Sequence, residues 1–486
     1  MNMAKQCLAH PNDEVAIIDL TDDARRDVTY GDLAHMVDGL ARALMSKVGA
    51  GDRVGVLLSQ TPWCAAAHLA IWKLGAISVP LFKLFKYDAL ASRMGDAGVA
   101  LVLTDSEGMA LVGDLAPCWM ADTAGVDGDP VAFFDAENDT PAVLIYTSGT
   151  TGTPKGALHG HGVLDGHLPG VCLSHDDLGQ PGDCLWTPAD WAWIGGLFDV
   201  LMPGLALGVP VVGARMAKFS VDDCLKVVAQ ADVKNIFFPP TALRMLKADN
   251  AKIPNLRSVA SGGEPLGAEM LAWGQHAFGL TINEFYGQTE CNMVVSSCST
   301  RFPVRPGFMG RAVPGFDVQV IDQNGEPTKE EGDIAVRRGA PSMMLRYWNR
   351  PQETEAKFRG DWMLTGDRGQ SDRAEIRFVG RDDDVITSSG YRIGPAEIED
   401  CLLTHPDVVT VGVVGKPDAL RTEIVKAYVV LREGAVEDAA GLQAWVKDRL
   451  ASYSYPREIG FLDALPMTVT GKVIRKKLKA MAKVTS

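Results

Sequence analysis

The chain has 486 residues, which is too long for one compact domain, so we expect two or more domains. Hydrophobic residues make up 47% and charged residues 22%, values typical of a folded globular protein, and this composition excludes a disordered chain. Asp and Glu number 61 against 47 Lys and Arg, and the resulting net charge of -14 repels polyanions, so we expect no nucleic-acid partner.

The first part of the chain alternates short apolar, β-branched runs with longer amphipathic stretches. The runs predict strands at residues 54–58, 77–81, 99–104, 142–146, 235–238 and 281–285. The amphipathic stretches predict helices at residues 63–74, 222–230 and 266–278. This alternation predicts an α/β fold of mostly parallel sheets that are buried on both faces.

The pattern changes after about residue 313. Residues 318–322, 332–337 and 376–380 predict antiparallel strands, which form a small β-barrel-like subdomain. An acidic run at 382–384 indicates a linker, so we expect an N-terminal domain of residues 1–382 and a smaller α+β domain of residues 383–486. Within the smaller domain, helices are expected at 395–405 and 439–450, and strands at 408–416 and 424–431.

Two features bear on the compartment. Residues 193–214 carry one charge, Asp199, but Pro203, Pro210 and several glycines favour a buried helix followed by a strand over a membrane span. The first ten residues lack the pattern of a signal peptide. Nine scattered cysteines without a CxxC pair indicate neither a disulfide framework nor a zinc site, so we expect a cytoplasmic protein.

A loop rich in Ser, Thr and Gly follows the strand expected at 142–146. Glycine lets backbone amides turn toward an anion, hydroxyls add donors and Lys155 adds charge, so the loop is expected to bind phosphate. It is not a Walker A loop, which requires Gly where Pro154 precedes the lysine. The expected phosphate-binding residues are Thr147, Ser148, Gly149, Thr150, Thr151, Gly152 and Lys155.

Five further motifs follow this loop, at residues 261–265, 286–290, 365–367, 380–395 and 470–472. Together, in this order, the six resemble the acyl-adenylate-forming superfamily over nearly the whole chain, and residues 388–395 are most similar to its medium-chain acyl-CoA synthetases. The resemblance implies an ATP-dependent acid–CoA ligase. Such an enzyme forms an acyl-AMP and pyrophosphate, and then transfers the acyl group to the thiol of CoA.

The resemblance also assigns a nucleotide site. Tyr286 would stack on adenine, and Asp367 would accept hydrogen bonds from the ribose hydroxyls. Glu290 would bind Mg²⁺ and act catalytically together with Thr289, whose hydroxyl would lie near the phosphates. The other implied ATP or AMP contacts are Gly263, Glu264, Pro265, Gly287, Gln288, Arg381 and Arg392.

Lys472 matches a lysine that, in the family, lies on a mobile C-terminal domain and bridges acyl and phosphate oxygens during adenylation. The resemblance therefore implies that Lys472 is catalytic, because it would neutralise charge that develops in the transition state. It also implies a rotation of the C-terminal domain about a hinge at Asp383 before thioester formation. Gly390 and Tyr391 would then border the tunnel for the CoA arm.

The acyl pocket is implied in part. Gly287 matches a position where acetate-specific relatives carry Trp, and Gly195 and Gly262 match two more wall positions. Three glycines leave room, so we expect an acid longer or bulkier than acetate, such as a short- or medium-chain fatty acid. Trp193 and Ile194 complete the expected pocket. Three neighbouring aromatic residues suit either a pocket or plain core: Trp186, Trp191 and Phe198.

Other interpretations remain open. An adenylation enzyme that loads a carrier protein is suggested by Phe198-Asp199, which is similar to the amine-binding carboxylate of peptide synthetases but lies about one helical turn too close to Gly208. A non-catalytic nucleotide sensor on the same fold would be expected to lack Lys472 or Glu290, and both are present. A luciferase-like oxygenase has no supporting feature. The protein is expected to be a monomer or a homodimer.

Overall fold

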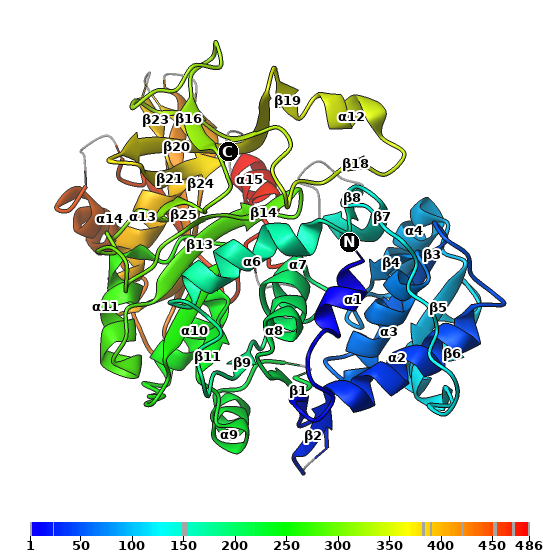
Figure 1. The fold of residues 1–486 in the computed structure, drawn as a ribbon. Helices are drawn as coiled ribbons and strands as arrows, with labels where there is room; N and C mark the ends of the chain where they lie inside the picture. Colours follow the sequence, from blue (N-terminus) through cyan, green and yellow to red (C-terminus); the bar gives the residue numbers. More distant parts are fainter. Residues whose placement is uncertain are drawn as a thin grey trace.

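The computed structural model describes residues 2–22, 24–147, 154–216, 218–381, 384–388, 391–418, 421–450, 454–468 and 472–484 (Figure 1). For Thr387, Tyr391, Arg392 and Val484 only the backbone is described.

A seven-stranded sheet lies near the N-terminus, in the order β18-β8-β7-β4-β3-β5-β6. Its strands are β3 (Arg53–Leu57), β4 (Ile77–Pro80), β5 (Leu101–Thr104), β6 (Cys118–Met120), β7 (Pro141–Thr147), β8 (Lys155–Gly160) and β18 (Arg346–Tyr347). Strands β3 to β7 run parallel, as their apolar runs predict, whereas β8 and β18 are antiparallel additions.

Helices accompany this sheet (Figure 1). They are α1 (Met3–Cys7), α2 (Tyr30–Leu44), α3 (Pro62–Lys73), α4 (Tyr87–Ala97), α5 (Ser106–Val112) and the 3₁₀ turn η1 (Ala121–Thr123). Helix α3 begins at Pro62 because proline suits the first helical position and the Thr61 hydroxyl accepts a hydrogen bond from Cys64 N at 3.2 Å.

The second sheet has 14 strands, in the order β16-β17-β20-β21-β15-β14-β13-β12-β11-β9-β10-β1-β2, with β19 paired to β20. The strands are β1 (Val15–Asp19), β2 (Arg26–Thr29), β9 (Leu185–Trp186), β10 (Val211–Gly213), β11 (Asn235–Phe237), β12 (Ser258–Gly262), β13 (Asn283–Gln288), β14 (Cys291–Ser296), β15 (Arg311–Ala312), β16 (Val318–Ile321), β17 (Gly332–Arg337), β19 (Phe358–Arg359), β20 (Trp362–Asp372) and β21 (Glu375–Arg381).

The strand pairing in this sheet changes from parallel to antiparallel across its width. Strands β1 and β9 to β13 are parallel, whereas pairing from β13 onward through β21 and β16 is antiparallel. The antiparallel strands expected after residue 313 are therefore present. They continue the parallel sheet, because β14 and β15 bridge the two halves, and within the described ranges they close no barrel.

Further helices and one π-helix belong to this part of the chain. They are α6 (Val163–Ser174), α7 (Ile194–Gly196), the π-helix η2 (Leu197–Leu201), α8 (Met202–Leu207), α9 (Val221–Ala231), α10 (Pro240–Ala248), α11 (Gly267–Phe278) and α12 (Pro351–Glu355). The apolar stretch at 193–214 is thus helical and then enters strand β10, as its prolines and glycines predict. Among the described residues, no helix is both long and apolar enough to cross a membrane.

The C-terminal unit, orange to red in Figure 1, is built on a five-stranded sheet. Its elements are β22 (Ile386–Ser388), β23 (Tyr391–Ile393), β24 (Val408–Asp418), β25 (Thr422–Leu431), β26 (Glu458–Phe461), α13 (Pro395–Leu403), α14 (Ala439–Lys447) and α15 (Arg475–Val484). Helices α13 and α15 both pack on β24, and α13 also contacts β21 and α11 of the preceding part. The boundary at residues 382 and 383 stays a prediction, since both residues lie outside the described ranges.

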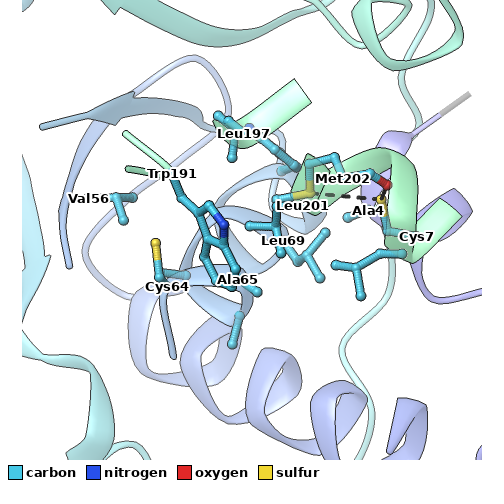
Figure 2. Close-up of a cluster of buried hydrophobic side chains, with 14 of the residues drawn as sticks. Ala4, Cys7, Val56, Cys64, Ala65, Leu69, Trp191, Leu197, Leu201 and Met202 are labelled. Carbon is cyan, nitrogen blue, oxygen red and sulfur yellow. Dashed lines mark hydrogen bonds between the residues drawn. The ribbon is translucent and has the colours of Figure 1, made fainter. Parts of the chain in front are cut away.

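One buried cluster joins the two larger sheets. In Figure 2, Trp191 lies among Val56, Cys64 and Leu197, so the chain entering η2 packs directly on β3 and α3. Nearby, the Cys7 thiol donates a hydrogen bond to the backbone oxygen of Met202 at 3.7 Å. All nine cysteines are free. This core anchors the segment that carries Trp193, one of the expected acyl-pocket residues.

Candidate active site

The two ends of the expected phosphate-binding loop are held by a β-hairpin. Thr147, the last residue of β7, is the register partner of Lys155, the first residue of β8. Lys155 Nζ forms an ion pair with Glu353 Oε2 at 2.5 Å and lies 5.3 Å from the ring centroid of Tyr347. Five expected loop residues lie outside the described ranges: Ser148, Gly149, Thr150, Thr151 and Gly152.

Thr289 and Glu290 occupy the turn between β13 and β14. Glu290 Oε1 accepts a hydrogen bond from Tyr347 Oη at 2.5 Å, and the backbone oxygen of Thr289 accepts one from His159 Nε2 at 2.8 Å. Burial lowers the pKa of His159 to about 4, so this imidazole is neutral near pH 7 and carries its proton on Nε2. The turn is therefore fixed from both sides by buried side chains.

The expected Mg²⁺ ligand is a single carboxylate. Among the described residues, no group of three or more His, Cys, Asp or Glu side chains could hold a metal ion. One carboxylate beside phosphate oxygens fits Mg²⁺, which keeps several waters and is commonly held by one or two carboxylates plus nucleotide phosphates. Glu290 fits this role, because the Tyr347 hydroxyl is the only side chain that hydrogen-bonds to it in the part of the chain that the structure describes.

Tyr286 and Asp367 lie together, as a shared nucleotide site requires. Tyr286 Oη donates a hydrogen bond to Asp367 Oδ2 at 2.5 Å, and Arg381 Nε lies 3.4 Å from Asp367 Oδ1. Burial raises the pKa of Asp367, while the Arg381 charge and the Tyr286 hydroxyl oppose this shift. The carboxylate is thus positioned by groups on β13 and β21, although it belongs to β20.

Gln288 links two of the site's motifs through a lysine that the sequence motifs do not include. Gln288 Nε2 donates to the backbone oxygen of Thr365 at 3.0 Å, and Gln288 Oε1 accepts from Lys357 Nζ at 3.0 Å. Burial lowers the pKa of Lys357, while the carboxylates of Glu290 and Asp367 oppose this effect. Lys357 therefore ties β13 to β20 beneath the expected nucleotide contacts.

Lys472 enters the site from the C-terminal unit. A side-chain carbon placed on Gly263 would lie 3.7 Å from Lys472 Nζ and 3.6 Å from the Trp193 ring, and Nζ is 5.8 Å from that ring's centroid. The backbone of Lys472 is held by Thr468, whose Oγ1 accepts from Lys472 N at 3.0 Å. Burial lowers the pKa of Lys472, and the carboxylates of Glu264, Asp367 and Glu290 oppose this shift. The expected catalytic lysine therefore faces both the acyl and the nucleotide residues.

The three wall glycines do not face empty space. A side-chain carbon on Gly195 would lie 2.8 Å from the Trp193 ring, and one on Gly262 would lie 2.5 Å from the Phe285 ring. A side-chain carbon on Gly287 would lie 2.5 Å from both Asn292 Oδ1 and the backbone nitrogen at 293. The expectation that these glycines leave open room is therefore wrong, because neighbouring groups already fill the space.

Those neighbours form an aromatic group beside Lys472. The ring centroids of Trp193 and Phe237 are 5.8 Å apart, and those of Phe237 and Phe285 are 5.0 Å apart. Ile194 is buried in the same core. Apolar and aromatic side chains of this kind line small-molecule sites.

The remaining aromatic residues of the segment belong to the core. Trp186 and Trp191 are fully buried, and Trp186 packs edge-on against Phe238 with ring centroids 6.3 Å apart. Phe198 is also fully buried and stacks on Trp72 with ring centroids 6.1 Å apart. Of the two interpretations that the sequence left open for these residues, the structure favours plain core.

A cavity of about 990 Å³ lies between the C-terminal unit and the preceding part, and Pro265 lines it. Glu264, next to it, pairs with Arg244 at 2.5 Å. Glu284 of β13 and Asp400 of α13 also face this cavity. Burial raises the pKa of Glu284 to about 8 and that of Asp400 to about 7, and the charge of Asp400 adds to the shift of Glu284.

Several expected positions cannot be placed. The hinge Asp383 and the tunnel residue Gly390 lie outside the described ranges. Tyr391 and Arg392 belong to β23, but their side chains also lie outside what is described.

Sequence reasoning missed five site residues: His159, Phe237, Phe285, Tyr347 and Lys357. A signal existed for the two phenylalanines, since each lies at or near the carboxyl end of a parallel strand, and such ends meet at one edge of a sheet. For the other three, no local pattern distinguishes them from ordinary buried or surface residues.

Comparisons with known proteins agree with this geometry. Residues 3–348 match the family described as AMP-binding enzyme, and residues 397–472 match the AMP-binding enzyme C-terminal domain. The chain is 34% identical to the uncharacterized acyl-CoA ligase YtcI of Bacillus subtilis (strain 168), over 88% of this chain and 85% of that protein. It is 33% identical to the acetyl-coenzyme A synthetase of the same organism, over 94% and 86%. It is 34% identical to the mitochondrial acyl-coenzyme A synthetase ACSM2 of Rattus norvegicus, over 88% and 80%.

Solved structures show the same fold. ATP-bound MatB from Rhodopseudomonas palustris superposes with a TM-score of 0.87 at 26% identity, over 99% of each chain. An acyl-CoA synthetase from Brucella canis gives a TM-score of 0.74 at 31% identity, over 99% of this chain and 94% of the other. The expected resemblance is confirmed: the chain belongs to the AMP-binding enzyme family, as an acyl-CoA synthetase that uses ATP, Mg²⁺ and coenzyme A.

Proposed function

We propose that this acid–CoA ligase activates a carboxylic acid longer or bulkier than acetate, such as a short- or medium-chain fatty or related acid. The observation that carries the proposal is the position of Lys472 Nζ, 5.8 Å from the centroid of the Trp193 ring, with Phe237 and Phe285 beyond that ring. The aromatic group supplies an apolar surface larger than a two-carbon acid needs, and Lys472 supplies charge for its carboxylate.

In the first half-reaction, a carboxylate oxygen of the acid attacks the α-phosphorus of ATP. The new C–O–P linkage gives acyl-AMP, and the bond to the β-phosphate breaks, which releases pyrophosphate. Because both reactants are anions, cations must stabilise the transition state, and we assign this role to Lys472 and Lys155. Glu290 would hold Mg²⁺, and the bound ion would supply further positive charge for this step. Tyr286, Asp367 and Arg381 hold the nucleoside.

In the second half-reaction, the CoA thiol attacks the acyl carbon, the thioester forms and AMP leaves. Lys472 sits beside the acyl residues, and a thiol needs access to the same carbon. We therefore propose that the C-terminal domain, residues 383–486, rotates about Asp383 between the half-reactions. Gly390 and Tyr391 would then border the path of the CoA arm.

A panel of acids tests the proposal. Acids from two to ten carbons, with branched and aromatic members, are offered with ATP and Mg²⁺, and AMP and acyl-CoA are measured with and without CoA. We expect the highest kcat/KM for an acid larger than acetate. A clear preference for acetate would refute the size assignment. Transfer to a carrier protein but not to CoA would instead favour a loading enzyme.

The same panel addresses a non-catalytic sensor. Such a protein would bind ATP but release no pyrophosphate with any acid, whereas this chain carries both Lys472 and Glu290 in the site. We also place the enzyme in the cytoplasm, since its nine free cysteines suit a reducing compartment. Fractionation of the producing cells would test that assignment.

A further inference from the structure

The pairing of β13 with β14 is irregular opposite Gly287. Gln288 pairs with Cys291 and Tyr286 pairs with Val295, so Gly287 alone faces the three residues 292–294. Within this bulge, Met293 has a φ of +53°, a left-handed conformation that is uncommon for residues other than glycine. Bulges redirect side chains and are frequent next to active sites, and unusual backbone conformations gather there too. The bulge thus marks a place where the sheet presents a particular side chain.

That side chain is Asn292. Its Oδ1 lies 2.5 Å from the place where a side-chain carbon of Gly287 would be, so the bulge depends on the missing side chain at 287. Its Nδ2 donates a hydrogen bond to Asp199 Oδ1 at 2.8 Å. Within the part of the chain that the structure describes, Oδ1 of Asn292 accepts no hydrogen bond. The amide is therefore fixed at its nitrogen and leaves an acceptor oxygen beside Gly287.

The position of this oxygen is defined by its neighbours along β13. Gly287 stands between Tyr286, which contacts Asp367, and the turn that carries Glu290, and Phe285 of the aromatic group precedes Tyr286. Because Gly287 lies between these residues on β13, we place the Asn292 oxygen at the border between the aromatic group and the nucleotide residues. An acid bound between Lys472 and the aromatic group would pass this border.

Asp199 belongs to the same segment as Trp193. It lies in the π-helix η2, a rare helix type that often occurs at functional sites, and only 2% of its surface is exposed. His167 Nε2 lies 4.0 Å from Asp199 Oδ1 and has no hydrogen-bond partner among the described residues, whereas His167 Nδ1 donates to the backbone oxygen of Val163 at 2.7 Å. The mechanism proposed above uses none of these groups.

Burial disfavours charge on both titratable groups of this cluster. Burial lowers the pKa of His167 to about 3, so this ring is neutral. Burial also raises the pKa of Asp199 well above its usual range, with the Asn292 hydrogen bond opposing the shift, so burial favours the neutral form of this carboxyl group. An uncharged cluster favours a neutral hydrogen-bond donor over an ammonium group.

We propose that Asn292, positioned by Asp199, is a specificity-determining residue that accepts a hydrogen bond from the acid, and that the preferred acid carries a hydroxyl group on its apolar chain. The inference rests on the function proposed above, because it requires the acid to bind between Lys472 and the aromatic group. A mostly apolar surround that presents the Asn292 oxygen selects a substrate with a donor, since a chain without a donor would leave that oxygen unsatisfied.

The test compares matched acids. Alkanoates of four to eight carbons and benzoate are each paired with the hydroxy and amino derivatives of the same skeleton, and kcat/KM is measured by pyrophosphate release. We expect the best hydroxy acid to exceed its parent by about fivefold, the effect of one hydrogen bond between neutral groups. A preference for the unsubstituted parent acid, or for its amino derivative, would overturn the proposal. Absence of pyrophosphate with every acid would instead reject the proposed function.

Variants distinguish the contact that Asn292 makes with the acid from the positioning of Asn292 by Asp199. Asn292→Leu should abolish the hydroxyl preference while leaving the KM for ATP unchanged. Asp199→Asn keeps a neutral acceptor for Asn292 and should retain the preference, whereas Asp199→Leu should lose it. Asn283→Ala is a control, because Asn283 is a buried amide on β13 whose Nδ2 instead donates to the backbone oxygen of Ser174. An unchanged preference in Asn292→Leu would overturn the proposal, and if that variant does not fold, Asn292→Ser serves instead.

Discussion

Replacing Lys472 by alanine tests the site most directly. The Nζ group lies beside both the acyl and the nucleotide residues, 3.7 Å from the carbon position on Gly263 and 5.8 Å from the Trp193 ring centroid. Removal of one group that stabilises developing charge in a buried site lowers a rate by about 10²–10³-fold. We expect a loss of that size in acyl-AMP formation, measured by pyrophosphate release without CoA.

The second half-reaction supplies the contrast. Thioester formation from acyl-AMP added together with CoA should keep most of its rate in Lys472→Ala, because the proposed rotation of the C-terminal domain moves this lysine away before the second half-reaction. Lys477→Ala is a matched control on the neighbouring helix α15, where the side chain is exposed. Equal losses in both half-reactions, or a loss below about tenfold in the first, would refute the assigned role.

A pH profile gives an independent readout of the same residue. Burial lowers the pKa of Lys472, and the charged form is the active one, so adenylation should decline with rising pH before an ordinary lysine would titrate. Thioester formation from supplied acyl-AMP should lack this alkaline limb. If both half-reactions lose rate at alkaline pH, the titrating group is one other than Lys472.

Three further predictions concern neighbouring groups. Glu353→Gln frees Lys155 from a partly exposed ion pair, so the KM for ATP should fall about twofold to fivefold in initial-rate assays, and an unchanged KM would contradict this. Glu284 and Asp400 have raised pKa values in the folded protein, so protons held there are lost, and stability falls, as pH rises from about 4 to about 8. Glu284→Gln should therefore raise the Tm relative to wild type near pH 8 but not near pH 5, and an equal effect at both would count against the raised pKa. Gly287→Ala places a carbon 2.5 Å from the backbone of β14, so the free energy of unfolding, measured by thermal denaturation, should fall by about 1–3 kcal/mol. An unchanged Tm would show that β14 moves to make room without a cost in stability.

Much of the fold could be predicted because its signals are local. The apolar runs at 54–58 and 235–238 become β3 and β11, since strands of a parallel sheet are buried on both faces and show it in their composition. The joining of the antiparallel strands to the large sheet was not predictable in this way. It depends on β15, which pairs with β14 on one side, meeting β21 from a distant part of the chain on the other, and no short pattern encodes that contact.

The site residues also differ in whether a local sequence signal identifies them. Lys472, Tyr286 and Asp367 could be named because each lies in a short motif, and the structure brings them together. The bond between Tyr347 and Glu290 spans 57 residues and that between Asn292 and Asp199 spans 93, so neither leaves a local signal. The expectation of open room at the three glycines was wrong for a physical reason. The sequence shows that a glycine has no side chain, but it does not show which neighbouring group fills the space.

The ion pairs and hydrogen bonds of the nucleotide site carry one more consequence. Lys155 is held by Glu353, Glu290 by Tyr347 and Asp367 by Tyr286. A nucleotide that arrives must therefore exchange partners with the protein, trading one satisfied contact for another at each position. The affinity for the nucleotide then depends on small free-energy differences between similar contacts. When AMP and pyrophosphate leave, each protein group forms its original contact again. In the mechanism proposed above, this exchange of partners favours the release of both anionic products, AMP and pyrophosphate.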